Sequence, residues 1–321
     1  MAADEKEVLV KADHVKVYFK GRDKTSGTVK AVDDVSFDIM KGETFGVVGE
    51  SGCGKSTLGR TLVRLQKPTD GHIYLNETDI AGLKGAELKR MRKKAQIIFQ
   101  DPSACLNPRR TVRQILMEPF EIHGLKKQKD IEARIIQLLH LVGLDLYYLS
   151  RYPHELSGGQ KQRIGIARAL ALEPEIIVCD EAVSALDVSV QAQVLNLLQE
   201  LKAKLGLTYF FISHNLNVVY QVSDRVGVMY LGKMVEIAAY DQLYEKRFHP
   251  YTEALLSAIP QVDQDKKTER IHLEGEVPSP SNPPPGCPFH TRCPRASEKC
   301  SRTIPELKEV EEGHFVACHL Y

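Results

Sequence analysis

The feature that most constrains the fold is a glycine-rich octapeptide at residues 49–56, which reads Gly-Glu-Ser-Gly-Cys-Gly-Lys-Ser. It fits the pattern G-x-x-x-x-G-K-[ST], and it follows a short apolar strand expected over Glu43–Val48 and leads into a helix expected over Ser56–Leu65. Strand, glycine-rich loop and helix in this order predict the opening of an α/β nucleotide-binding fold. In such a loop, backbone N–H groups and the positive end of the helix hold phosphate oxygens.

This loop also contains the side chains that phosphate chemistry requires. Lys55 is expected to reach the β- and γ-phosphates, and the hydroxyl of Ser56 is expected to ligate Mg²⁺. A chance glycine-rich turn is the alternative, and the strand-to-helix setting disfavours it. The other residues expected to contact the nucleotide here are Ser51, Gly52, Cys53, Gly54 and Thr57.

A second group of acidic residues follows a buried strand. The apolar run Ile176–Cys179 ends in Asp180 and Glu181. Asp180 is expected to hold Mg²⁺, and Glu181 is placed to orient or deprotonate an attacking water. An apolar run ending in Asp-Glu is also a common exit from a strand, but the preceding phosphate loop favours the catalytic interpretation.

The rest of the chain alternates between strands and helices. Strands are expected over Val8–Phe19, Val29–Ile39 and Thr208–Ser213, helical structure within Gln114–Leu149, and a helix over Val190–Leu205. Apolar strands bracketed by helices imply a mostly parallel sheet that is covered on both faces.

Composition excludes several classes of protein. The 321 residues include 43 Lys and Arg and 42 Asp and Glu, a net charge of +1, which argues against a broad nucleic-acid-binding face. No stretch approaches the roughly 20 apolar residues of a membrane-spanning helix. The charged start, residues 1–13, lacks the apolar core of a signal peptide. We therefore expect a cytoplasmic chain whose membrane role, if any, comes through a partner.

Leu156–Gln160 reads Leu-Ser-Gly-Gly-Gln and is followed by Lys-Gln-Arg-Ile-Gly-Ile-Ala-Arg. With this string after the phosphate loop, the chain resembles the ATP-binding subunits of ABC transporters. The resemblance implies that the segment closes on the γ-phosphate held by an opposite subunit, so that one chain supplies two half-sites and no complete one. A capped helix with a flexible start is the alternative for a bare Ser-Gly-Gly. The residues given this role are Ser157, Gly158, Gly159 and Gln160.

The same resemblance assigns roles to further residues. Gln100 would touch Mg²⁺ and the attacking water and couple the site to membrane subunits, and His214 would contact the γ-phosphate. Phe19 would stack on adenine, with Tyr18 as second choice. Residues 184–187 would cross the dimer interface. The chain departs from the family at Ala182, where Pro is usual, and at Asn215, where Asp is common; this puts the hydrolysis rate in more doubt than nucleotide binding.

The implied fold is a P-loop ATPase with a RecA-like core, an antiparallel β subdomain and a helical subdomain at about residues 102–165. It would occupy residues 1–260, followed by an extension at 261–321 with four cysteines. Within the extension, Gln261–Glu276 is polar, and the proline-rich segment Pro278–Pro288 is expected to be an extended connector.

Four segments place the chain near the dipeptide and oligopeptide importers, and features of two of them favour the F-type subunit. The implied function is ATP hydrolysis that powers peptide import. Implied partners are a homologous ATPase subunit, two transmembrane permeases and, indirectly, an extracytoplasmic peptide-binding protein, with this chain peripheral at the cytoplasmic face. Import of another small solute such as nickel, and a non-transport ABC ATPase, are the alternatives. The segments are Phe99–Arg109, Ser184–Asn196, His249–Leu256 and Cys287–Pro294.

The cysteines of the extension are spaced C-x5-C-x6-C-x17-C. Four soft thiolates suit either a [4Fe–4S] cluster or structural Zn²⁺. The resemblance to peptide-importer subunits favours the iron–sulfur cluster, and free or oxidised thiols are the third possibility. His290 and His319 are expected to be neighbours of the cysteines and not ligands. The cysteines are Cys287, Cys293, Cys300 and Cys318.

Overall fold

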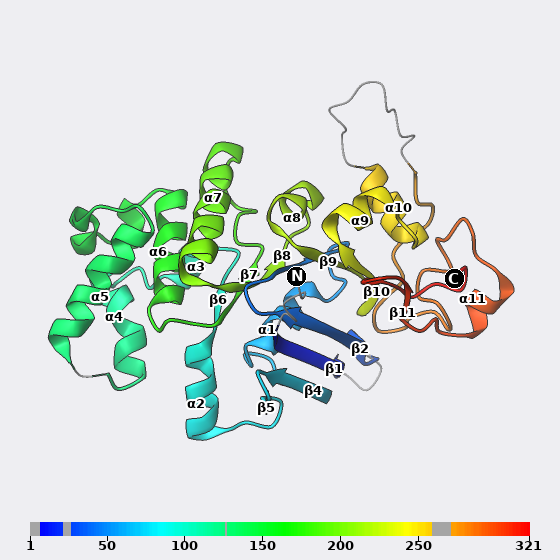
Figure 1. Cartoon of the computed structure of the whole chain (residues 1–321), viewed down its shortest axis with the longest axis horizontal. Coiled ribbons are helices and arrows are strands. Elements are labelled where there is room, and N and C mark those ends of the chain that lie inside the picture. Colours follow the sequence, from blue (N-terminus) through cyan, green and yellow to red (C-terminus); the bar gives the residue numbers. More distant parts are fainter. Residues whose placement is uncertain (1–6, 22–26, 126, 259–270) are drawn as a thin grey trace, which may run out of the picture.

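A computed structural model describes residues 7–21, 27–125, 127–258 and 271–321. The expected start of the extension at residue 261 and most of the polar segment Gln261–Glu276 lie outside these residues. The described chain forms two sheets, a group of helices at one end and a loop-rich C-terminal part at the other (Figure 1).

The larger sheet has eight strands in the order β11-β12-β10-β9-β3-β8-β7-β6. Five of them, from β9 to β6, are parallel to one another, and β10, β12 and β11 extend the sheet with antiparallel pairs. The parallel strands are β3 (Thr44–Val48), β6 (Ala95–Ile98), β7 (Ile176–Asp180), β8 (Thr208–Ile212) and β9 (Arg225–Tyr230). The antiparallel strands are β10 (Lys233–Ala239), β11 (Lys308–Glu311) and β12 (His314–Val316).

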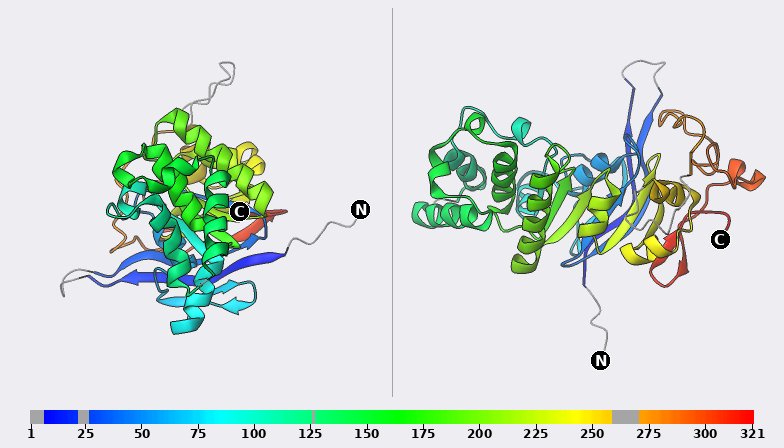
Figure 2. Two further views of the ribbon diagram at one scale, coloured as in Figure 1. Left: turned by 90° about the vertical axis from the view of Figure 1, so that its left-hand side faces the viewer. Right: turned by 90° about the horizontal axis from the view of Figure 1, so that it is seen from above.

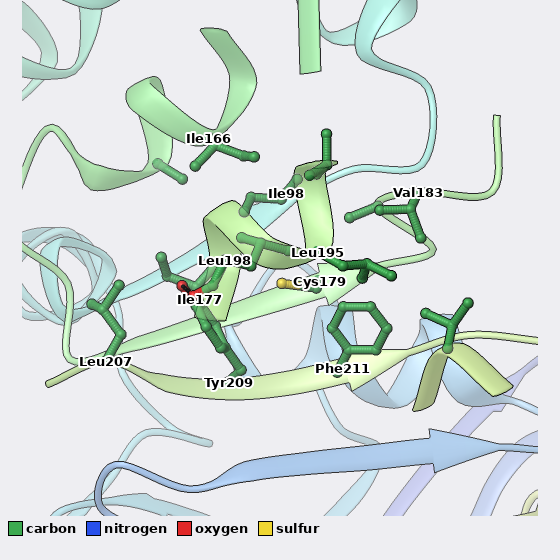
Figure 3. Close-up of a cluster of buried hydrophobic side chains, with 14 of the residues drawn as sticks. Ile98, Ile166, Ile177, Cys179, Val183, Leu195, Leu198, Leu207, Tyr209 and Phe211 are labelled. Atoms are coloured by element: carbon green, nitrogen blue, oxygen red, sulfur yellow. Dashed lines mark hydrogen bonds between the residues drawn. The ribbon is translucent and has the colours of Figure 1, made fainter. Parts of the chain in front are cut away.

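Alternate residues of the central strands enter two separate cores. Ile177 and Cys179 of β7 and Phe211 of β8 pack toward helix α7 (Val188–Leu205), a face shown in Figure 3. Val178 and Phe210 point the other way, against helix α1 (Lys55–Leu62) and the second sheet. This period of two explains why the strands are apolar throughout, since both faces of the sheet are buried.

The second sheet is antiparallel, in the order β2-β1-β4-β5, and covers the α1 side. Its long strands β1 and β2 pair along most of their length and extend as a ribbon beyond the core (Figure 2). Helix α2 (Gly85–Lys94) then leads back to β6. The strands are β1 (Val8–Phe19), β2 (Val29–Met40), β4 (Asp70–Leu75) and β5 (Thr78–Asp79).

A group of helices lies at the β6 edge of the large sheet (Figure 1). Their apolar faces join the same core as α7. The elements are α3 (Pro102–Cys105), α4 (Val112–Ile122), α5 (Gln128–Leu141), the 3₁₀ helices Leu146–Ser150 and Pro153–Glu155, and α6 (Gly158–Leu170). At the other side of α7 follow α8 (Leu216–Val222), α9 (Tyr240–Glu245) and α10 (Pro250–Ser257).

The cysteine-bearing extension is packed onto the core of the large sheet and does not stand apart from it. Its strand β12 pairs with β10, and its buried Phe289 contacts the rings of Tyr230, His249 and Tyr251. Helix α11 (Glu298–Arg302) is the one helix of residues 271–321. The sequence did not predict these short strands, and the extension shares the core instead of needing its own.

Among the described residues no helix is both long and apolar enough to cross a membrane.

Candidate functional site

The loop of residues 49–56 curls tightly because two of its glycines have no room for a side chain. Gly49 has φ 150°, and a Cβ built there would lie 2.2 Å from the carbonyl oxygen of Met229. Gly54 has φ 106°, and its Cβ would lie 1.9 Å from the carbonyl oxygen of Ala31. Only glycine fits both constraints. The backbone can therefore pass close to β2 and β9, and its N–H groups, together with the N-terminus of α1, can form an anion-binding site.

Lys55 is folded back over this loop. Its ammonium group donates hydrogen bonds to the carbonyl oxygens of Gly49 at 2.7 Å and Glu50 at 3.0 Å, and it lies 3.7 Å from the sulfur of Cys53. Burial raises the pKa of the Cys53 thiol, against the opposing effect of the Lys55 charge. The loop therefore holds a cation at its centre and keeps the neighbouring thiol protonated.

Two residues predicted to hold Mg²⁺, Ser56 at the start of α1 and Asp180 at the end of β7, are in contact. The hydroxyl of Ser56 donates to one carboxylate oxygen of Asp180 at 2.6 Å, and the guanidinium of Arg60 lies 3.2 Å from the other. Asp180 is 2% exposed. A hydroxyl and a buried carboxylate in contact are hard oxygen donors of the kind that Mg²⁺ prefers, so this pair fits the cation.

Glu181 lies beside both of the other predicted catalytic residues. The side-chain amide of Gln100 donates to its Oε2 at 2.8 Å, and Nδ1 of His214 lies 3.5 Å from the same oxygen. Glu181 has φ 49°, a left-handed conformation that is uncommon outside glycine. Its backbone N–H donates to the carbonyl of Ile212 on β8, which helps hold that conformation. The carboxylate is thus presented at the sheet edge next to Asp180.

Of the two aromatic residues at the end of β1, Phe19 is the more exposed. Its side chain is 41% exposed. The hydroxyl of Tyr18 instead donates to Asp33, and the ammonium of Lys30 lies 5.7 Å from the centre of the Tyr18 ring. Phe19, the first choice from the sequence, is therefore the better placed to stack on a base.

The segment of residues 157–160 forms the start of α6 and belongs to the group of helices, away from the loop of residues 49–56. Ser157 and Gln160 form a capping box, in which the Gln160 N–H donates to the Ser157 hydroxyl and the Ser157 N–H to the Gln160 side chain. In the parts of the chain that the structure describes, no hydrogen bond or ion pair joins this segment to residues 49–57. The chain brings together one half of the predicted site and leaves the other half elsewhere.

Comparison with known proteins identifies the family of this chain. The family model described as ABC transporter matches residues 32–184, and one described as oligopeptide/dipeptide transporter, C-terminal region, matches residues 235–300. The chain is 55% identical over its whole length to an oligopeptide transport ATP-binding protein, AppF, of Bacillus subtilis, all of which is covered. It is equally identical, over 98% of its length and 95% of the relative, to the putative oligopeptide transport ATP-binding protein YkfD of that organism. The chain belongs to the ABC transporter ATP-binding subunits of the oligopeptide/dipeptide type.

Solved structures of ABC cassettes share the fold. A dimeric post-hydrolysis structure of the cassette MJ0796 bound to ADP and Pi is 29% identical, with a TM-score of 0.64, covering 72% of this chain and 98% of the other. The cassette cbiO1 of Clostridium perfringens is 26% identical, with a TM-score of 0.65, and the match covers 75% and 92% of the two chains. As an ABC ATPase, the chain has ATP as its nucleotide.

The two departures from the family pattern have structural roles here. Ala182 is 1% exposed and packs in the core beneath Glu181. The side chain of Asn215 caps α8 by accepting from the N–H of Asn217 at 3.0 Å. Neither substitution removes a group that contacts Glu181.

The four cysteines of the extension lie near one another. Burial and the neighbouring thiols raise the pKa of Cys287 to about 11, and the same causes raise the pKa values of Cys293 and Cys318. Backbone amides of Phe289, Arg295, Ser297 and Leu320 hydrogen-bond to the four sulfurs. All four thiols are free, and no group of three or more His, Cys, Asp or Glu side chains in the described residues could hold a metal. The predicted metal-binding tail is therefore not supported by the geometry.

Each of the two histidines near these cysteines has one ring nitrogen hydrogen-bonded to a backbone carbonyl. Nδ1 of His290 lies 2.8 Å from the carbonyl of Cys287, and Nε2 of His319 lies 2.8 Å from that of Thr303.

Three residues at the site escaped the sequence reasoning. Arg60 lies one helical turn after Ser56, so the i, i+4 spacing could have placed it near Asp180. Tyr148 accepts a hydrogen bond from the side chain of Gln160. Arg292, of the extension, lies 2.9 Å from the carboxylate of Glu50 in the phosphate loop, and its distance along the chain gave no signal.

Proposed function

We propose that this chain is the ATP-hydrolysing subunit of a membrane importer for oligopeptides or dipeptides. The observation that carries this proposal is the match over the full length of both chains to a protein named as an oligopeptide transport ATP-binding subunit. The match of the C-terminal region to the oligopeptide/dipeptide family supports it, because that region is not part of the ABC transporter match.

In this proposal the loop of residues 49–57 binds the phosphates of ATP, with Lys55 turned from its loop carbonyls toward the β- and γ-phosphates. Ser56 and Asp180, with Gln100, hold the Mg²⁺, which supplies neutralisation of the phosphate charge. Glu181 orients and accepts a proton from the attacking water, and Gln100 and His214 fix its carboxylate.

The second half-site requires a second subunit. The exposed capping box of Ser157 and Gln160 presents N–H groups at the start of α6, where an anion is favoured. We propose that it closes on the γ-phosphate held by a homologous ATPase subunit, in a homodimer or a heterodimer. Two membrane permeases would dock near Gln100, at the cytoplasmic face, and an extracytoplasmic peptide-binding protein would deliver the peptide.

We also propose that the four cysteines bind a [4Fe–4S] cluster, with Zn²⁺ as the alternative. The support is chemical, because four thiols that already interact and that each receive an N–H hydrogen bond are soft donors suited to either metal. Protein purified without oxygen would show a brown colour and about four irons and four sulfides per chain. Zinc in place of iron would select the alternative, and absence of metal would reject both.

The transport role is tested by isolating the chain from its own cells through an affinity tag. We expect two membrane permeases and a homologous ATPase to co-purify, and the ATPase activity of the complex to rise when a peptide-loaded binding protein is added. If nickel or another solute stimulated the ATPase activity and peptides did not, that solute would replace peptides as the proposed substrate. Recovery with ribosomes or DNA-associated proteins, and without permeases, would reject transport altogether.

A further inference from the structure

A side chain of the cysteine-bearing extension reaches into the phosphate loop. One guanidinium nitrogen of Arg292 lies 2.9 Å and 3.2 Å from the two carboxylate oxygens of Glu50. Glu50 is the second residue of the loop of residues 49–56, and Arg292 directly precedes Cys293. The two residues are 242 positions apart in the chain.

The pair is shielded from solvent. The side chain of Arg292 is 8% exposed and that of Glu50 is 25% exposed. Removal of Arg292 would leave the Glu50 carboxylate without its counter-charge at a partly shielded position. Here the uncompensated charge would be a carboxylate within a loop whose function is to bind a polyanion.

The surroundings hold both partners in place. The backbone N–H of Glu50 donates to the hydroxyl of Tyr251 at 2.9 Å, and the Arg292 guanidinium also lies 3.5 Å from the hydroxyl of Tyr230. Phe289, three residues before Arg292, is fully buried against the rings of both tyrosines. The contact between the extension and the loop is therefore a packed one, with two aromatic residues of the core beneath it.

We propose that Arg292 is a positioning residue for the phosphate loop, and that it makes nucleotide affinity depend on the cysteine-bearing extension. It neutralises Glu50 and fixes the start of the loop, so that the loop presents N–H groups and Lys55 to the phosphates without a competing negative charge. Because Arg292 and Cys293 are adjacent, a rearrangement at Cys293 would move the partner of Glu50. The inference rests on ATP binding at this loop, as in the proposed function.

The test is a titration of the purified full chain with a fluorescent ATP analogue and Mg²⁺. We expect Arg292→Ala to weaken binding by about tenfold, the effect of removing one charge-assisted contact. Adding Glu50→Gln to that variant removes the uncompensated carboxylate and should restore affinity to within about twofold, on the same energy scale. A role limited to folding would give no such rescue.

The matched control is Arg295→Ala, which breaks another ion pair between the extension and the core, with Glu253 at 2.7 Å and not with a residue of the loop. It should bind the analogue like the unmodified chain. If Arg292→Ala does not fold, Arg292→Gln keeps a polar side chain and permits the same comparison. Unchanged affinity in the Arg292 variant, or a double variant as weak as the single one, would overturn the inference. Failure of the unmodified chain to bind would count against the proposed function instead.

Discussion

The side-chain amide of Gln100 donates a hydrogen bond to the carboxylate of Glu181 over 2.8 Å, which joins the strand β6 exit to the strand β7 exit. These residues are 81 positions apart, and His214 reaches the same oxygen from the end of β8. Three parallel strands thus place three polar side chains at the edge of the sheet formed by the carboxyl ends of its strands, next to Asp180. This edge is where open α/β sheets bind their ligands.

Glu181→Gln should retain ATP binding and lose hydrolysis. The amide keeps the size of the side chain but cannot accept a proton, so we expect the rate to fall by at least about a hundredfold. The variant should also accumulate as an ATP-bound closed dimer, which light scattering would detect. The control is Glu306→Gln, whose side chain is 82% exposed. Normal turnover in Glu181→Gln would remove this residue from the catalytic role.

Lys55→Ala should weaken ATP binding by about ten- to a hundredfold, since charge-assisted hydrogen bonds to phosphate are lost. The folded chain should tolerate the change, because Lys55 bonds only to loop carbonyls and the Cys53 sulfur. Binding is measured by calorimetry, with the exposed Lys204→Ala as the control. Unaltered affinity for ATP in Lys55→Ala would contradict the assignment of residues 49–56 as the phosphate-binding loop.

Gly54→Ala should be far more disruptive than Gly52→Ala. Both glycines have positive φ, at 106° and 79°, but only at Gly54 would the new Cβ meet a backbone atom, the Ala31 oxygen at 1.9 Å. At Gly52 no atom lies within 4 Å, so the cost there is the conformational one, about 1–2 kcal/mol. Thermal unfolding and ATP titration of the two variants make the comparison. Equal losses would mean that close packing of the loop against β2 is not the constraint.

Stability should fall between pH 6.5 and about 4 because of His249. Burial lowers its pKa from 6.5 to about 4 in the folded chain, against the raising effect of Glu236. In this range the unfolded chain binds the additional proton, so lowering the pH favours unfolding, by up to roughly 3 kcal/mol. The stabilisation is complete above pH 6.5.

The matched variant for this effect is His249→Asn. Nδ1 of His249 accepts from the N–H of Tyr251 and caps α10, a contact that Asn can replace without titrating. Denaturant unfolding at several pH values should give a shallower acid loss in the variant. An identical slope in both proteins would exclude His249 as the cause.

Phe289→Ala should destabilise the whole chain, by about 3–5 kcal/mol, as expected for a large aromatic residue removed from a core. Phe289 is fully buried against Tyr230 and Tyr251 of the ATPase core. The exposed Ile304, in the same extension, serves as the control. If Phe289→Ala unfolded the extension alone and left the main transition unchanged, the extension would be an independent appendage.

The sequence predicted those parts of the fold and the site that depend on local pattern. Strand β1 was predicted with the bounds that the structure gives it, and the loop of residues 49–56 follows β3 and runs into the start of α1. Strands β11 and β12 were missed because they are four and three residues long, and β11 has no buried residue that would mark it. The pairing of β12 with β10, and of β11 with β12, holds these short strands in the sheet.

Proximity within the site was harder to predict than residue identity. The placement of Gln100 and His214 came from resemblance to a family, since no spacing rule joins residues on different strands. The pairing of Arg292 with Glu50 had no such guide, because each is one charged residue in a loop and neither belongs to a periodic pattern. Contacts of this kind are created by the packing of Phe289 and the tyrosines, which becomes visible only in the folded chain.

The central claim is that ATP hydrolysis at Glu181 of this chain powers peptide import. Its most direct test is uptake of a labelled oligopeptide by cells that carry either the unmodified chain or Glu181→Gln, with equal amounts of each protein at the membrane. The account predicts uptake with the unmodified chain and nearly none with the variant. Equal uptake in the two strains would contradict it.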